Sequence, residues 1–348
     1  MPSTSKSSAA GARALTATEI ADLVGVSVAT VSKVLNGRSD VGAETRRLVE
    51  EVISAHGHRR RRRRSAPAAP FVELVLNVLG GSYAMEIIAG VERALRPHNV
   101  GVMVSSLDLA ETPGDDWADR MLARRPTGII TVFCGPSAEQ RERLTAGEIP
   151  YVVVDPFVEL AGVPSVAATN WTGGLEAGRH LLGLGHRRIG VVTGPTSALA
   201  SRARLDGYRA AHDEAGIPFD PALVRSGPFR SNAGAAATRD LLSGPEIPTA
   251  IFAFSDPIAV GVYRVAAELG LRIPEDLSVV GYDDTAPATW LYPALTTIRQ
   301  PLAEMAAEAA AMILALSRGE SLARIRVVLA TELTVRASTA APRRPVAD

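Results

Sequence analysis

The amino-acid sequence predicts an α/β protein in which a small three-helix head, of the helix-turn-helix kind, precedes a larger core of two doubly wound subdomains. Three observations predict this architecture. Three short amphipathic segments, separated by turn residues, follow one another before residue 57. Residues 58–70 then combine an arginine run with two prolines, which oppose compact folding. From residue 71 onward, short apolar runs alternate with helix-length stretches, the pattern of parallel sheets covered by helices on both faces.

The composition of the 348 residues is that of a globular chain, with 47% hydrophobic residues and enough length for two or three folded units. The one cysteine, Cys134, cannot form an internal disulfide, and no Cys/His cluster has the spacing of zinc ligands. No apolar run resembles a secretory signal or reaches membrane-spanning length. We therefore expect a cytoplasmic chain with no membrane partner, no cofactor and no metal.

The net charge of zero hides an asymmetry along the chain. Residues 1–70 hold 12 Lys and Arg against 6 Asp and Glu, an excess of +6, which leaves 25 against 31, or −6, for the remainder. The head is therefore basic and the body acidic. A basic head favours an anionic polymer as partner, and the alternative is a solvated tail.

Capping residues mark the first two helices of the head, which spans residues 15–57 after an expected disordered tail over 1–14. Thr16 and Glu19 form a T-x-x-E capping box. Gly25 suits the turn that follows, and Ser27 suits the cap of the second helix. The residues expected to point inward are Ile20, Ala21 and Val24 in the first helix and Val31, Val34 and Leu35 in the second.

A third helix is predicted near residues 44–55, with one apolar stripe against the first two helices. The stripe consists of Leu48, Val49, Val52 and Ile53. Three short helices with one turn between the first pair describe a helix-turn-helix unit.

The second helix has the side chains to read a DNA major groove. Lys33 can donate to guanine, and Val28 and Ala29 can contact a thymine methyl. The side chains expected to donate to phosphates are those of Thr16, Ser27, Thr30, Ser32, Asn36 and Arg46. The alternative is a three-helix docking module whose surface happens to be polar.

The core begins at residue 71, after a linker over residues 58–70. Its strand-like runs are FVELVLNVL, VGVMVSSL, GIITVF and YVVVD, then RIGVVTG, AIFAFS and LSVVGYDD. They form two sets that divide near residue 170, which favours two doubly wound subdomains over one wide sheet. A final helix near residues 301–317 and the strand-like VVLATELTVRAST complete them.

These runs predict the domain boundaries. The first subdomain comprises residues 71–170 and 301–325, the second comprises residues 171–300 and 326–340, and residues 341–348 form a tail. Ligands of such folds bind at the carboxyl ends of the strands, and a cleft between two subdomains suits a small polar molecule.

Several motifs together resemble one family. The segment LTATEIADLVGVSVATVSKVLNGRSDVGAETRRLVEEV closely resembles the DNA-binding head of the lactose-repressor (LacI-type) family of bacterial transcription regulators. GHRRIGVVTGP, SRARLDGYRAA, LGLRIPEDLSVVGYDD and PALTTIRQP resemble the ligand-binding core of that family, in the same order and at similar separations. The resemblance covers nearly the whole chain.

The resemblance implies a homodimeric regulator, usually a repressor, that binds a pseudo-palindromic double-stranded DNA operator. Its core is similar to periplasmic sugar-binding proteins, and a small effector, often a sugar, sets the operator affinity. The effector contacts of the family fall on Tyr83, Asp155, Arg204, Phe229, Ser255 and Asp283. Arg204 supplies donors and Asp283 acceptors for sugar hydroxyls, while Phe229, and Trp171 or Trp290, could stack on sugar faces. The alternatives are a structural ion pair and aromatic packing.

The chain departs from the family pattern at two places. Ser255 stands where the family commonly has asparagine, which puts that hydrogen bond to the effector in question. Residues 58–70 replace the usual hinge helix, so we expect Arg59, Arg60 and Arg61 either to contact phosphates or a minor groove, or to belong to a linker that stays unfolded.

Two other function classes compete with a regulator. An enzyme is disfavoured because the sequence has no GxxxxGK[ST], GxSxG or HExxH motif and its six histidines are scattered. A sugar-binding protein without a regulatory role fits the core equally well, but the basic head and the missing signal peptide favour a regulator. The polar tail carries no leucine heptad, which favours a dimer over a tetramer.

Overall fold

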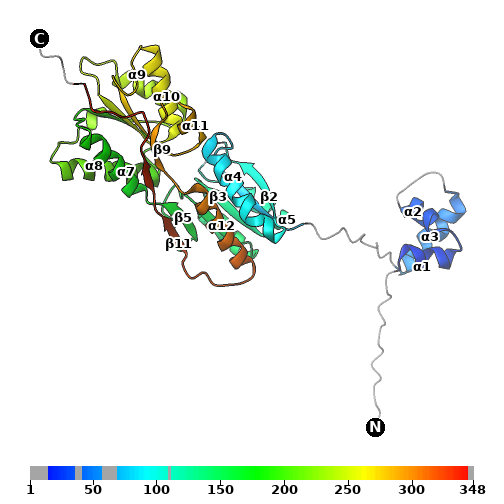
Figure 1. Cartoon of the computed structure of the whole chain (residues 1–348). Coiled ribbons are helices and arrows are strands. Elements are labelled where there is room, and N and C mark those ends of the chain that lie inside the picture. The colour runs from blue at the N-terminus through cyan, green and yellow to red at the C-terminus, as the bar shows by residue number, and fades with distance from the viewer. Residues whose placement is uncertain (1–14, 36–40, 57–68, 109–110, 344–348) are drawn as a thin grey trace, which may run out of the picture. The chain divides into compact units, whose positions relative to one another are not determined.

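The chain divides into two compact units, with the boundary between residues 68 and 69, and each unit is described by itself. The structure is a computed structural model that describes residues 15–35, 41–56, 69–108 and 111–343. Figure 1 shows the chain with its elements labelled. Asn36 and the Arg59–Arg61 segment, both predicted to contact DNA, lie outside the described residues.

The described residues of the first unit form three helices, α1 (Ala17–Val24), α2 (Val28–Leu35) and α3 (Ala43–His56). The capping box ahead of α1 is present: the Glu19 carboxylate accepts from the Thr16 N–H at 2.7 Å, and Thr16 Oγ1 accepts from the Glu19 N–H at 3.4 Å. Gly25 ends α1 with a φ of 72°, the left-handed backbone that glycine tolerates best. Ser27 Oγ accepts from the Thr30 N–H at 3.1 Å, which satisfies a free donor at the start of α2.

Five residues form the buried centre of this unit: Ile20, Ala21, Val31, Val34 and Val49. Two expectations about its core are wrong. Leu35 is 38% exposed and Leu48 is 39% exposed, because each stands at the edge of its apolar stripe and three short helices cannot cover that edge.

The second unit contains two six-stranded sheets. The first has the order β11-β5-β4-β3-β1-β2 and is parallel throughout. Its strands are β1 (Phe71–Leu76), β2 (Gly101–Ser106), β3 (Gly128–Val132), β4 (Tyr151–Val154), β5 (Ser165–Ala168) and β11 (Arg326–Leu329). Its helices are α4 (Ser82–Leu95), the 3-10 helix η1 (Arg96–His98), α5 (Trp117–Arg124), α6 (Ala138–Ala146) and α12 (Leu302–Ser317).

Alternating side chains of β1 explain how helices cover both faces of this sheet. Leu74 packs in a cluster with α4 and α12, whereas its neighbour Val75 packs in a cluster with α5 and α6. Figure 1 shows α12 alongside α4, although more than two hundred residues separate them in the sequence. Their approach is close, because a Cβ at Gly90 of α4 would overlap the Cβ of Ala306 of α12.

The second sheet has the order β12-β10-β9-β8-β6-β7 and is parallel except for β12, which pairs antiparallel with β10. Its strands are β6 (Ile189–Thr193), β7 (Val224–Ser226), β8 (Ala250–Ala253), β9 (Ser278–Asp283), β10 (Thr296–Arg299) and β12 (Glu332–Thr334). Its helices are α7 (Asn170–Gly183), α8 (Leu199–Ala215), η2 (Pro221–Leu223), α9 (Ser231–Leu241), α10 (Asp256–Glu268) and α11 (Ala286–Trp290). Helices α7 and α8 cover one face, and α9 and α10 cover the other.

The chain passes between the two sheets three times: from β5 to α7, from β10 to α12, and from β11 to β12. The first and third passages are joined, since Thr169 and Thr331 share hydroxyl and backbone hydrogen bonds at 2.9 Å. The sequence predicts residues 326–340 in the second subdomain, but β11 pairs with β5 of the first sheet, so that boundary is wrong. No glycine or proline marks the passage at residues 330–331, and the strand-like run therefore reads as one strand.

None of the helices in the described part of the chain combines the length and the apolar character that crossing a bilayer requires.

Candidate functional site

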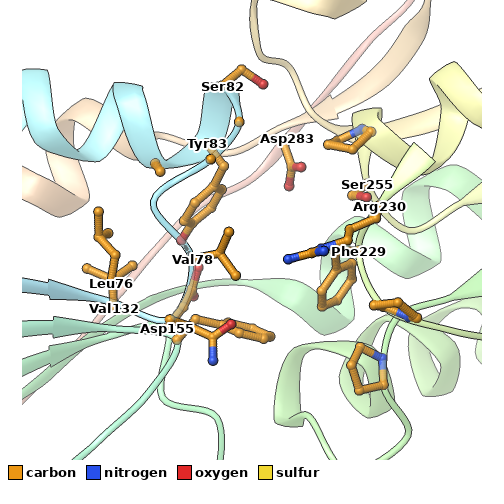
Figure 2. A pocket seen from close by; sticks show the side chains of 18 of the residues that line it. Leu76, Val78, Ser82, Tyr83, Val132, Asp155, Phe229, Arg230, Ser255 and Asp283 are labelled. Carbon is orange, nitrogen blue, oxygen red and sulfur yellow. Dashed lines mark hydrogen bonds between the residues drawn. The ribbon is translucent and has the colours of Figure 1, made fainter. Parts of the chain in front are cut away.

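A cavity of about 670 Å³ lies where loops of the two sheets meet. Its walls come from both subdomains: Tyr83 and Asp155 belong to the first, and Arg204, Phe229 and Asp283 to the second. Figure 2 shows the side chains of Tyr83, Asp155, Phe229 and Asp283 around one space. Because loops at the carboxyl ends of parallel strands carry most of the lining, the cavity has the position expected for ligand sites of doubly wound folds.

Tyr83 and Asp155 meet in the wall formed by the first subdomain. Tyr83, in the first turn of α4, donates its hydroxyl hydrogen to Asp155 Oδ2 at 2.5 Å. Asp155 follows β4 with a φ of 47°, and this backbone turns its carboxylate toward the cavity. Burial raises the pKa of the Asp155 carboxyl, against the lowering effects of Tyr83 and Arg204.

Arg204 is 4% exposed, and its guanidinium is held on several sides. Its Nε donates to Asn170 Oδ1 at 2.8 Å and its Nη1 donates to the Phe254 carbonyl at 2.5 Å. The guanidinium carbon lies 3.5 Å from the centre of the Tyr282 ring. Gly174 of α7 allows the backbone of Arg204 on α8 to approach this closely, because a Cβ at Gly174 would overlap that backbone.

Asp283 ends β9 at 5% exposure, and its Oδ1 accepts from Gln300 Nε2 at 2.7 Å. Burial, followed by the nearby Asp256 carboxylate, raises the pKa of Asp283 well above its ordinary value. Asp256, at the start of α10, accepts from the Thr285 N–H at 2.7 Å and from the Thr297 hydroxyl at 2.7 Å. Burial raises the pKa of Asp256 to about 6.

Ser255 lines the cavity, but its hydroxyl oxygen is already in use. Ser255 Oγ accepts from the Ile258 N–H at 3.3 Å as the N-cap of α10. Its remaining capacity for a ligand is therefore smaller than that of an asparagine amide, which offers both donors and an acceptor.

Three phenylalanines form an aromatic wall. The Phe133 ring lies 5.2 Å from that of Phe157 and 5.5 Å from that of Phe229, edge to face in both pairs. Gly194 makes room for this wall, because a Cβ there would overlap the Phe229 ring. The wall offers apolar surface to a ligand whose other faces meet polar groups.

Two buried acceptors in the lining have no partner within the described residues. They are Asp155 Oδ1 and Gln300 Oε1, on residues that are 5% and 4% exposed. A buried acceptor without a donor costs free energy, of the order of 1–3 kcal/mol. A ligand that brings hydroxyl donors into the cavity would remove this cost.

The structure brings six of the seven sequence-predicted effector residues to the cavity, and Trp171 is the exception. Trp171 is the second residue of α7, 47% exposed and not part of the lining. Arg204, the sixth residue of α8, lines the cavity, and the tight packing of α7 on α8 brings Asn170 to Arg204 while the indole of Trp171 stays outside. Trp290, at 77% exposure, also lies outside the lining.

Sequence reasoning misses Asn77, Phe133, Phe157, Arg230 and Gln300, all of which line the cavity. Asn77 and Phe133 directly follow β1 and β3 at their carboxyl ends, where ligands bind, but the predicted runs FVELVLNVL and GIITVF counted both as strand residues. Gln300 lies within the motif PALTTIRQP, but its hydrogen bond to Asp283 spans 17 residues and has no local signal.

The second candidate site is the outer face of α2. Val28, Ala29, Ser32 and Lys33 are exposed, while Val31 and Val34 on the opposite face are buried. Ser27 is exposed beside them, and Thr16, Thr30 and Arg46 are half-buried at the edges of this face. The exposed face of α2 therefore consists of a narrow row of small side chains and one cation, Lys33, outside the buried core of the three helices.

Two family models match the chain. One is described as "Bacterial regulatory proteins, lacI family" and matches residues 16–60; the other is described as "Periplasmic binding protein-like domain" and matches residues 179–339.

Known proteins match over most of their lengths. The Ribose operon repressor of Haemophilus influenzae is 32% identical over 296 residues, which are 82% of this chain and 87% of that protein. The solved structure of a "transcriptional regulator CelR-cellobiose complex" is 31% identical with a TM-score of 0.68, over 93% of this chain and 99% of that one. The lac repressor dimer bound to operator and the anti-inducer ONPF is 26% identical with a TM-score of 0.69, over 94% and 100% of the two chains.

Proposed function

The chain belongs to the LacI family of bacterial regulatory proteins, and from this premise we propose that it acts in the cytoplasm as a dimeric repressor that a carbohydrate releases from, or fixes on, its operator. It is a DNA-binding transcriptional regulator with an effector core of the periplasmic-binding-protein type, and not an enzyme. The observation that carries the effector proposal is the cavity in which polar residues of both subdomains converge.

The outer face of α2 is the proposed base-reading surface. Lys33 donates to guanine acceptors, and the small side chains of Val28 and Ala29 allow close approach to thymine methyl groups. The proposed phosphate contacts are Thr16, Ser27, Thr30, Ser32 and Arg46, joined by Asn36 and Arg59–Arg61. In the dimer each half-site of a pseudo-palindrome receives one α2.

The cavity is proposed to hold a mono- or oligosaccharide. Its volume of about 670 Å³ lies within the range of small-molecule sites. Asp155, Asp283 and Arg204 supply the acceptors and donors that hydroxyl groups require, and the aromatic wall covers an apolar sugar face. Likeness to a regulator solved with cellobiose and to a ribose operon repressor supports a carbohydrate.

A second copy of this chain is the proposed protein partner. Ser82 Oγ donates to Thr285 Oγ1 at 2.9 Å, which places the start of α4 beside the start of α11. Large exposed apolar side chains follow in both segments: Met85 at 59%, Trp290 at 77% and Tyr292 at 97%. Exposed apolar groups of this size favour a protein interface, and likeness to the lac repressor dimer supports a copy of the same chain.

Binding of the effector is proposed to change the operator affinity by favouring one arrangement of the two subdomains. The three passages of the chain between the sheets allow such a change, and a ligand that contacts both walls binds one arrangement better than another.

Selection of DNA fragments by the purified full-length protein tests this proposal. We expect retained fragments to share a pseudo-palindrome, and at least one carbohydrate to change their retention. Retention without sequence preference would contradict the DNA-reading role. Retention that no carbohydrate alters, together with no calorimetric binding of any carbohydrate, would contradict the effector role.

A further inference from the structure

Arg230 brings a cation to the effector cavity that no motif predicts. It follows Phe229 and occupies the N-cap position of α9. In Figure 2 its side chain extends into the middle of the cavity, toward the wall that holds Tyr83 and Asp155. Its guanidinium is therefore placed to meet a ligand.

No carboxylate pairs with Arg230 among the residues that the structure describes. Its neighbours in sequence differ, because Arg225 pairs with Asp240, and Arg239 pairs with Glu268 at 2.6 Å. Arg225 and Arg239 form these ion pairs in the same subdomain but outside the cavity lining. Arg230 keeps its full set of donors for another partner.

The beginning of α9 adds positive character at the same place. Ser231 and Asn232, the first two residues of this 11-residue helix, line the cavity, and the side chain at the N-cap makes no capping hydrogen bond. The first intrahelical hydrogen bond runs from the Gly234 N–H to the Arg230 carbonyl, and the Ala233 N–H donates to Asn232 Oδ1 at 2.8 Å, so the N–H groups of Ser231 and Asn232 are the ones left without a helical partner. N–H groups of this kind at a helix N-terminus favour an anion.

Two other parts of the lining lack hydrogen-bond donors. Asp155 Oδ1 is an unpartnered buried acceptor beside Tyr83 in the first subdomain, and Gln300 Oε1 is an unpartnered buried acceptor beside Asp283 in the second. Hydroxyl groups of a carbohydrate would satisfy them. The lining therefore offers donors and positive charge at Arg230 and the start of α9, and acceptors at Asp155 and Gln300.

We propose that the effector is a carbohydrate that carries one anionic group, a carboxylate or a phosphate, and that Arg230 and the start of α9 bind this group while Asp155 and Gln300 accept from the hydroxyls. The inference rests on the effector role proposed above. It names Arg230 as the residue that distinguishes a charged carbohydrate from its neutral parent.

Negative charges in the lining limit how strongly the cavity should prefer a charged carbohydrate over its neutral parent. Glu111, Asp155 and Asp283 carry carboxyl groups, and Arg204 carries a second cation. Arg230 is itself exposed, and solvent weakens its attraction. We therefore expect a preference of roughly tenfold, as for one charge-assisted hydrogen-bond pair.

The experiment compares the full-length protein with Arg230→Gln, Arg230→Lys and the control Arg202→Gln. Arg202 is an exposed arginine on α8 outside the cavity, so its substitution removes the same charge without touching the lining. Calorimetry measures the affinity for matched probes: glucose, gluconate, glucuronate and glucose 6-phosphate, and ribose with ribose 5-phosphate. The carboxylate and phosphate arms distinguish the two anionic groups.

We expect the parent protein and Arg202→Gln to bind at least one charged probe about tenfold more tightly than its neutral parent. Arg230→Gln should bring that ratio close to one with an unchanged affinity for the neutral sugar, and Arg230→Lys should keep part of it. An unchanged melting temperature shows that each variant is folded.

Two results would overturn the inference while leaving the effector role intact: neutral sugars that bind as tightly as their charged counterparts, or a charge preference that Arg230→Gln preserves. Failure of every probe to bind the parent protein would count against the effector role and the inference together.

Discussion

In the head, the residues proposed to read bases lie on the exposed side of an eight-residue helix, whereas in the core most residues proposed to contact the effector are themselves buried. The outer face of α2 carries its side chains free of the hydrophobic cluster, while Arg204 and Asp283 are fixed by hydrogen bonds at 4% and 5% exposure. A substitution in the first region therefore changes recognition alone. A substitution in the second changes recognition and local stability at once.

The largest effect is expected when the head loses its core. Ile20 is fully buried in a cluster of only five buried residues, and Ile20→Ala should cost about 2–4 kcal/mol of stability. So small a unit has little stability to spare, and operator binding measured by fluorescence anisotropy should be lost. Effector affinity should stay unchanged, because the core is a separate unit.

Leu23→Ala is the matched control on the same helix. Leu23 is 62% exposed, so its truncation should leave operator affinity nearly intact. An equal loss of operator affinity in Ile20→Ala and Leu23→Ala would show that the head tolerates the truncation of neither a buried nor an exposed side chain. The contrast between a surface that can be changed and a buried site that cannot would then fail.

The next largest effect concerns the cavity. Arg204→Ala and Asp283→Ala should each weaken effector binding by about 1.5–3 kcal/mol, as for the loss of a hydrogen bond to a charged group. Arg204→Ala should also lower the melting temperature, because the Phe254 carbonyl and Asn170 lose their donor. Calorimetry and thermal unfolding measure the two effects.

Arg202→Ala controls for the removal of an arginine from α8. Neither the effector affinity nor the melting temperature should change in this variant. Unaltered effector affinity in both cavity variants would place the ligand elsewhere.

A smaller effect is expected from pH. The pKa of Asp256 is about 6 in the folded chain, and burial raises it from the usual 3.8. The folded state therefore holds this proton to higher pH than the unfolded state, so the stability linked to it is present at low pH and is lost as pH rises through 6. In Asp256→Asn this titration is absent.

The stability of the parent chain relative to Asp256→Asn should therefore fall by roughly 1–2 kcal/mol between pH 5 and pH 7.5. Urea unfolding at several pH values measures this difference. Titrating groups far from Asp256 cancel between the two chains, and Asp283, whose pKa the Asp256 carboxylate raises, is the neighbour whose titration also changes. Parallel stability curves would show that the hydrogen bonds from Thr285 and Thr297 keep Asp256 charged throughout.

The smallest effect is expected at the outer face of α2. Lys33→Ala should reduce the preference for the operator over its best single-base mismatch by about 1 kcal/mol, roughly fivefold, because one exposed lysine contact is lost. Overall stability should not change. Competition binding with mismatched duplexes measures the preference.

Arg47→Ala is the control for charge in the head, since Arg47 lies on α3 and pairs with Glu44 and Glu51 at the surface. An equal loss of preference in both variants would mean that general charge, rather than the position of Lys33, governs recognition.

The head was largely predictable because its signals are local. Thr16, Glu19, Gly25 and Ser27 cap or end helices through contacts within a few residues, and the structure confirms each. The predicted burial of Leu35 and Leu48 is wrong. An apolar stripe shows only which side chains could be covered, and the head has too few neighbouring residues to cover the edge of the stripe.

The core was predictable in its fold but less so in its cavity. Alternating strands and helices gave two parallel sheets without any knowledge of distant contacts. The hydrogen bond between Tyr83 and Asp155, by contrast, joins residues 72 positions apart. Family resemblance pointed to those two residues, but it did not point to Phe157, Arg230 or Gln300, which no local pattern marks.

The three passages between the sheets also govern how the protein is made. The ribosome completes most of the second sheet before it releases α12, whose apolar residues Met305, Ala306 and Ile313 cover one face of the first sheet. At usual translation rates the interval from β5 to α12 lasts on the order of ten seconds, during which α4 alone covers that face.

Late nonsense or frameshift mutations should consequently be as harmful as early ones. A chain that stops near residue 300 lacks β11 and β12, the outer strands of the two sheets, as well as α12. Both subdomains would then emerge with an open edge and exposed apolar surface, which chaperones and proteases recognise. Residues 301–343 therefore supply a piece of each half of the core, and neither half is complete without them.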